Sequence, residues 1–222
     1  MKARISGTHF PLRTLGPGKR LGIWFQGCGL ACPGCMSRHT WEPGGGRATD
    51  VSDLARQWGE ALEKGAEGLT VSGGEPLDQA DALDALLTDA ARLRDRFAAG
   101  GEGADLLVYT GYEPDELTES HHRALRHADA VITGRFRVER PTRLVWRGSA
   151  NQRLTPLTPR GGTRYAPHLS RESTGSRLEV AVEAGSPVRV RVHGVPLRGE
   201  LRAFEKGLAE AGVTIKAPSW RA

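Results

Sequence analysis

Short apolar runs alternate with amphipathic stretches through the first 135 residues of the chain. The apolar runs have the length and the glycine or polar borders of buried strands, which are expected at 21–25, 69–71, 106–109 and 130–132. The stretches between these runs repeat apolar residues at helical spacing. Helices are therefore expected at 51–62, 83–97 and 114–128.

This order, a strand followed by a helix several times over, is typical of α/β proteins. Such units form a parallel sheet or barrel with right-handed crossovers. In these folds the working groups gather at the carboxyl ends of the strands. Residues that directly follow the expected strands are therefore the first candidates for a functional site.

The pattern changes after residue 155, and three segments are predicted. Residues 1–155 form the strand–helix core, and residues 156–177, rich in Arg, Pro and Gly, are expected to be a linker or long loop. Residues 178–222 are expected to form a small α+β appendage.

The appendage is predicted from a different rhythm of apolar residues. Residues 178–182 and 188–192 alternate as half-buried strands do, and the turn between them, 183–187, suits a hairpin. An amphipathic helix is expected at 200–211 and a last short strand at 213–215.

The chain has 222 residues, enough to bury a core of its own. Residues 1–15 contain no apolar run that resembles a signal peptide, and no stretch reaches the apolar length that crosses a bilayer. We therefore expect a cytoplasmic protein in a reducing compartment, with no membrane partner.

The net charge of +5 is concentrated in one region. Between residues 134 and 171 there are nine arginines and a single acid, Glu139. Such a surface suits phosphates, nucleic acid or an acidic protein, while a solvated loop is the plainer interpretation. Aromatic residues that would stack on bases are sparse there, so we expect no nucleic-acid partner.

All three cysteines of the chain, Cys28, Cys32 and Cys35, follow the first expected strand. An odd number argues against a disulfide framework, whereas closely spaced thiolates select zinc, copper(I) or an iron–sulfur cluster. For a structural zinc site His39 is the nearby fourth ligand. For a cubane cluster one iron would stay open to a ligand that is not protein. Buried, unreactive cysteines are the remaining alternative.

The CxxxCxxC spacing resembles the signature of the radical S-adenosylmethionine enzymes, and the match is closer to the activating proteins of glycyl radical enzymes such as anaerobic ribonucleotide reductase. The stretches that carry this resemblance are 26–28, 32–35, 40–41, 72–77, 109–112 and 147–153. They stand in the family's order over roughly residues 1–155.

The resemblance implies a 4Fe–4S cluster on Cys28, Cys32 and Cys35, with S-adenosylmethionine bound to the open iron. Reductive cleavage would give a 5′-deoxyadenosyl radical that takes a hydrogen atom from a glycine of a partner enzyme. The implied fold is a partial (β/α) barrel. A reductase or a flavodoxin- or ferredoxin-type protein would supply the electron.

The resemblance also implies the residues that contact S-adenosylmethionine. Gly73 and Gly74 would let the backbone approach its methionyl end, and Glu75 would accept a hydrogen bond from the amine. Thr110 and Gly111 would meet the ribose or methionyl group. Asn151 would lie near the cofactor, although a structural cap on the last strand fits it equally well.

Three departures keep other functions open. Met36 follows the third cysteine, Thr133 stands where the family commonly has an aspartate, and the segment from residue 178 onward has no counterpart in compact activating proteins. Radical chemistry on another peptide, a nucleotide or a small molecule is one alternative. A non-catalytic iron–sulfur or zinc scaffold is the other.

Overall fold

A seven-stranded mixed sheet forms the centre of the molecule, with the strands in the order β3-β1-β2-β4-β5-β6-β7. The computed structural model describes residues 1–98, 103–175, 177–183, 185, 188–216 and 218–221. The strands are β1 (Lys2–Leu12), β2 (Arg20–Phe25), β3 (Arg47–Asp50), β4 (Gly68–Gly73), β5 (Asp105–Tyr109), β6 (Ala130–Thr133) and β7 (Arg153–Pro156).

The four strands expected from the sequence are the parallel part of this sheet. β2 pairs with β4, β4 with β5 and β5 with β6, all in parallel, while β1, β3 and β7 pair antiparallel. The α/β class is therefore confirmed. In the β2–β4 register Phe25 lies opposite Gly73, so the carboxyl ends of these two strands are level.

Helices α1 (Val51–Glu63), α2 (Ala80–Phe97) and α3 (Glu119–Leu125) supply apolar side chains to the main core, which covers one face of the sheet. A smaller cluster around Ile132 and Tyr165 fills the other face. The helix expected over 114–128 is divided, because Leu117 is extended and the side chain of Thr118 caps α3 as a separate helix.

The first residues of β2 and β5 join in a buried polar network beneath this second face. Arg20 donates to both carboxylate oxygens of Asp105, at 2.9 and 2.6 Å, and to the Thr70 hydroxyl at 2.6 Å. The Tyr165 hydroxyl also donates to Asp105. All four residues are at most 1% exposed. The network therefore lies at the amino ends of the strands, opposite the end that carries the cysteines.

Residues 156–177 differ from the expected linker, because they hold helix α4 (Pro159–Tyr165) and a 3-10 turn, Ala166–His168. The local reason is a cap. The Thr158 hydroxyl accepts a hydrogen bond from the Gly161 amide at 3.1 Å, and Pro159 occupies the first turn. Tyr165 then packs on the sheet, which gives this short helix a buried face.

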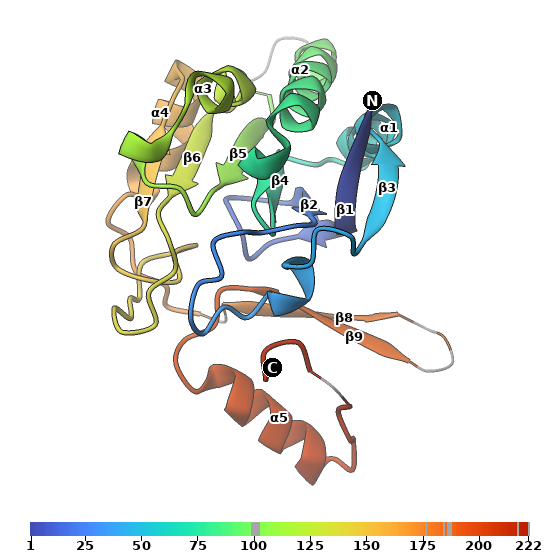
Figure 1. The fold of residues 1–222 in the computed structure, drawn as a ribbon, viewed down its shortest axis with the longest axis vertical. Helices are drawn as coiled ribbons and strands as arrows, with labels where there is room; N and C mark the ends of the chain where they lie inside the picture. The colour runs from blue at the N-terminus through green and yellow to red at the C-terminus, as the bar shows by residue number, and fades with distance from the viewer. Residues whose placement is uncertain (99–102, 176, 184, 186–187, 217, 222) are drawn as a thin grey trace.

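The final segment contains the expected hairpin, β8 (Leu178–Glu183) with β9 (Arg189–Gly194), and the expected helix, α5 (Glu200–Glu210). Residues 184, 186 and 187 of its predicted turn lie outside the described residues. The strand expected at 213–215 is wrong, since these residues have no strand partner. Figure 1 shows the hairpin and α5 at the end of the molecule opposite helices α1 to α4.

The hairpin contacts the main sheet through its polar face. His193 of β9 stacks between His9 and Trp24, with ring centroids 4.4 and 4.6 Å away. Glu179 of β8 accepts a hydrogen bond from the Arg13 amide at 2.9 Å. Within the described part of the chain, no helix is both long enough and apolar enough to cross a membrane.

Candidate cofactor site

The loop that carries the cysteines leaves the end of β2 and returns beside it. The Gly27 amide donates to the Thr40 carbonyl at 2.7 Å, and the Cys28 amide donates to the Trp41 carbonyl at 3.0 Å. The buried side chain of Gln26 adds two bonds to carbonyl groups where the loop closes. Both ends of the loop are therefore fixed to the sheet, and Cys28 sits at its edge.

The three thiols are all half-buried and free of disulfides. A tight turn joins the last two, because the Cys35 amide donates to the Cys32 carbonyl at 3.1 Å and Gly34 has φ +75°. The Ser37 amide donates to the Cys35 sulfur at 3.4 Å.

The structure does not gather Cys28, Cys32 and Cys35 as the ligands of one metal ion. Among the described residues, no three His, Cys, Asp or Glu side chains gather as a mononuclear metal site requires. A cubane makes a different demand, because its protein thiolates bind separate irons. Three half-buried thiols on one loop supply the donor type of such a cluster.

The Gly-Gly-Glu turn after β4 packs directly on the base of the cysteine loop. The Gly74 amide donates to the Phe25 carbonyl at 2.8 Å, and the Glu75 amide donates to the Gly27 carbonyl at 2.7 Å. A Cβ atom on Gly73 would overlap the backbone of Phe25, and one on Gly74 would overlap the Gly27 carbonyl. Both glycines are therefore needed for contact between two backbones, a role that the sequence did not reveal.

Glu75 joins the ends of β4 and β5. Its carboxylate is 1% exposed and accepts bonds from the Leu77 amide and the Thr110 hydroxyl, both at 2.9 Å, and from the Gly111 amide at 2.7 Å. Three of about four lone-pair positions are thus occupied, and one on Oε2 is left. Burial raises the pKa of Glu75 to about 7 despite these donors. The structure therefore brings Glu75, Thr110 and Gly111 together, as sequence reasoning grouped them.

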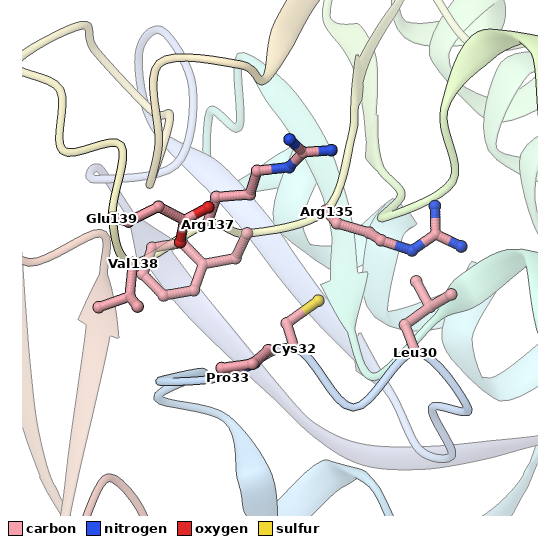
Figure 2. A pocket seen from close by; sticks show the side chains of 8 residues that line it. Leu30, Cys32, Pro33, Arg135, Arg137, Val138 and Glu139 are labelled. Atoms are coloured by element: carbon pink, nitrogen blue, oxygen red, sulfur yellow. The ribbon is translucent and has the colours of Figure 1, made fainter.

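A hollow of about 220 Å³ opens beside Cys32. Its lining residues are Leu30, Cys32, Pro33, Arg135, Phe136, Arg137, Val138 and Glu139. Figure 2 shows the Cys32 sulfur pointing toward the stretch that follows β6. Sequence reasoning treated that stretch only as part of the basic region, although its position after a strand end was the signal that would have found it.

Asn151 contacts the beginning of this stretch. Its side-chain amide donates to the Arg135 carbonyl at 2.9 Å, while its Oδ1 is buried and takes no hydrogen bond from the described residues. The neighbouring Gln152 accepts from the Gly148 amide at 2.7 Å and donates to the Gly134 carbonyl at 3.0 Å. Asn151 and Gln152 therefore hold the loop after β6 in place. The Asn151 Oδ1 remains an acceptor without a donor among the described residues.

Comparison with known proteins assigns the part of the chain that contains the cysteine loop to a protein family. The family described as 4Fe-4S single cluster domain matches residues 14–155. The anaerobic ribonucleoside-triphosphate reductase-activating protein of Escherichia coli (strain K12) is 30% identical over 141 residues, which cover 62% of this chain and 88% of that protein. The protein of the same name from Vibrio cholerae is 31% identical over 154 residues, 68% of this chain and 96% of that protein.

A third protein of that name, from enterobacteria phage T4, is 29% identical over 139 residues, which cover 63% of this chain and 85% of the phage protein. The family match ends at residue 155, directly before the segment that holds α4, the β8–β9 hairpin and α5. The match thus contains the cysteine loop, the Gly-Gly-Glu turn and Asn151, and leaves the last 67 residues outside it (222 minus 155).

Proposed function

Since this chain belongs to the radical S-adenosylmethionine family of activating proteins, whose 4Fe–4S domain it carries, we propose that it cleaves S-adenosylmethionine reductively and activates a partner glycyl radical enzyme. The observation that carries the proposal is a loop with the three thiols of the chain, fixed at its base to the turn that holds the buried carboxylate of Glu75. A structural metal site would be closed, whereas a catalytic one keeps a position for substrate.

Cys28, Cys32 and Cys35 are the residues that would hold the cluster. When bound and reduced, the cluster supplies the electron that cleaves the sulfonium and yields the 5′-deoxyadenosyl radical. The chain contributes position, because the loop is fixed to the end of β2 and the neighbouring turn is packed without room for a side chain.

Glu75 would receive the methionyl amine on the one lone pair of Oε2 that the protein leaves open. Gly73 and Gly74 would present backbone at the same end of the ligand, next to Thr110 and Gly111. Asn151 would offer its unpartnered Oδ1 to the ribose or to the substrate. In these roles the residues bind and orient, and none of them exchanges a proton in the reaction.

The fold, the electron donor and the location of the protein are part of the same proposal. The four parallel strands with their working ends at one edge would be the partial (β/α) barrel of this family. The electron would come from a reductase or from a flavodoxin- or ferredoxin-type protein. A cytoplasmic location suits cysteine ligands that are accessible to solvent and would need a reducing compartment.

Electron paramagnetic resonance tests the choice of substrate. The reduced holoprotein is mixed with S-adenosylmethionine and an anaerobic ribonucleotide reductase, and a glycine-centred doublet is expected. If 5′-deoxyadenosine forms with an authentic partner but no doublet follows, the segment after residue 155 serves another substrate. If about one zinc and no iron is found per chain, the protein is a scaffold instead.

A further inference from the structure

The loop after β6 lies against the cysteine loop near Cys32. We call residues 134–140 the arginine loop. A Cβ atom on Gly34 would be 3.3 Å from the Val138 Cβ, and Phe136 lies at a similar distance. The arginine loop and Cys32 line the same hollow, as Figure 2 shows. The arginine loop is therefore next to Cys32, one of the residues that would hold the cluster.

The arginine loop has a fixed backbone and cations without partners. The Arg137 amide donates to the Ser149 hydroxyl at 3.1 Å, and the Ala150 amide donates to the Arg140 carbonyl at 2.8 Å. The side chains of Arg137 and Arg140 are exposed and make no hydrogen bond or ion pair with the described part of the chain. The backbone of these two arginines is thus fixed, and their charged side chains can contact a second molecule.

The other charges on the loop are balanced differently. Arg135 already has an acidic partner, because its Nη2 donates to the Glu116 carboxylate at 2.9 Å. Glu139 also lines the hollow and offsets one cation. Arg137 and Arg140 together still leave an excess of positive charge over Glu139. A positive surface of this kind attracts an acidic protein and raises its rate of encounter.

Two apolar residues that line the hollow with Arg137 are exposed. Pro33 is exposed, and Val138 is 47% exposed although it is a large apolar side chain. Transient electron-transfer complexes have small interfaces, in which charges steer the encounter and a little apolar contact holds it. Exposed apolar residues with arginines nearby in the same loop, beside Cys32, have that composition.

The Gly-Gly-Glu turn and the arginine loop contact the cysteine loop at different points. The Gly-Gly-Glu turn contacts Gly27, next to Cys28, whereas the arginine loop contacts Gly34, between Cys32 and Cys35. A protein bound at the arginine loop would therefore lie beside Cys32, one of the residues that would hold the cluster.

We propose that Pro33, Arg137, Val138 and Arg140 form the docking surface for an acidic one-electron carrier protein. This inference rests on the proposed function, which requires one electron for each cleavage. In the docked complex the carrier loses one electron and the cluster gains it. No bond forms or breaks, and no proton moves in this step.

The test compares two reductants on the reconstituted holoprotein by stopped-flow absorbance. One is reduced flavodoxin, used as an acidic carrier, and the other is dithionite, which is too small to need a docking surface. Arg137→Glu/Arg140→Glu is compared with Arg92→Glu/Arg202→Glu, which makes the same change in net charge at exposed positions of α2 and α5.

At low salt the first variant should be reduced by flavodoxin about 10- to 100-fold more slowly than wild type, and as fast as wild type by dithionite. The second variant should match wild type with both reductants, and the wild-type flavodoxin rate should fall as salt is added. Equal flavodoxin rates in both variants would overturn the inference.

Two further outcomes would also overturn it. If the first variant is slow with dithionite too, the arginines act on the cluster rather than on a carrier. If its flavodoxin rate is normal but glycyl radical formation is lost, the surface holds the partner enzyme. A wild-type holoprotein that dithionite cannot reduce would count against the proposed function itself.

Discussion

Gly74 is the residue at which the turn after β4 meets the cysteine loop most closely. Its absent side chain leaves room for the Gly27 carbonyl, and the Thr40 carbonyl would lie 2.9 Å from an added Cβ. The Gly27 and Thr40 carbonyls belong to the hydrogen-bonded ends of the cysteine loop, so neither can move unless the loop moves. The glycine therefore sets the distance between the cysteines and Glu75.

We expect Gly74→Ala to lower the free energy of unfolding by about 1–3 kcal/mol or more, because the site becomes overpacked, and to lose most of its iron. Gly29→Ala is the matched control, since an added Cβ there meets nothing within 4 Å. Iron per chain after anaerobic reconstitution and urea unfolding measure the two effects. Equal iron content in the two variants would contradict this role of Gly74.

Glu75 predicts a pH dependence of stability in the metal-free protein. Its pKa is raised from 4.5 to about 7 by burial, so the folded chain favours the protonated form. The stabilising contribution of the proton is fully present below about pH 4.5 and is lost as the pH rises through about 7. The charged form is the costly one at neutral pH.

Glu75→Gln removes this titration and keeps the shape of the side chain. Between about pH 5 and about pH 8 the unfolding free energy of wild type should fall relative to the variant by on the order of 2 kcal/mol. Groups that titrate in both proteins cancel in the difference, which urea unfolding at several pH values measures. A difference that stays constant with pH would mean that Glu75 titrates normally.

At the scale of elements, the buried Arg20–Asp105 pair joins the amino ends of β2 and β5 to α4 through Tyr165. Asp105→Ala leaves the Arg20 guanidinium buried without its partner. We expect a loss of about 3–5 kcal/mol in the free energy of unfolding. Asp95→Ala is the control, because the Asp95 side chain is 62% exposed beside Arg94 and should cost at most about 1 kcal/mol.

The double variant Arg20→Met/Asp105→Leu sharpens this prediction. Removal of both charges should restore much of the stability, because a buried pair is often replaced by apolar residues at little cost. Urea unfolding of the three variants is the measurement. If Asp105→Ala costs no more than Asp95→Ala, the network does not hold the strands together.

The sequence predicted the elements that owe their form to local pattern. β2, β4, β5 and β6 are short apolar runs, and α1 and α2 have clear apolar faces, so each was expected within a few residues. β3 and β7 carry few apolar residues and exist because they pair with β1 and β6. Such pairing is a property of the assembled sheet and leaves little mark on the sequence.

The candidate site also has a part that the sequence could predict and a part that it could not. The spacing of the cysteines and the order of the strand ends were enough to group Glu75 with Thr110 and Gly111. The contact of Gly74 with Gly27 was not predictable, because it joins residues 47 positions apart through their backbones (74 minus 27). The hollow beside Cys32 was missed because Arg135 and Arg137 were counted as charge rather than placed at a strand end.

At the scale of the whole molecule, the basic region is not one surface. Arg147 is buried and donates to the His168 carbonyl at 3.0 Å, Arg164 pairs with Glu67 and Asp105, and Arg135 pairs with Glu116. The net charge of the region therefore overstates what a partner would meet. The part beside Cys32 keeps exposed cations, and that is where a partner is expected.

The final segment contacts the main sheet next to the cysteine loop. His193 stacks on Trp24, which lies four residues before Cys28, and the Ser219 hydroxyl donates to the Met36 carbonyl at 3.4 Å. The segment outside the family match thus contacts β2 and the cysteine loop.

The proposed cleavage of S-adenosylmethionine is tested most directly by its product. Anaerobically reconstituted wild-type protein, reduced with dithionite and supplied with S-adenosylmethionine, should form 5′-deoxyadenosine, measured by liquid chromatography. Cys32→Ala should form none, because it loses a thiolate ligand of the cluster. If wild type holds a reduced 4Fe–4S cluster and still yields no 5′-deoxyadenosine above the level of Cys32→Ala, the proposed activity is contradicted.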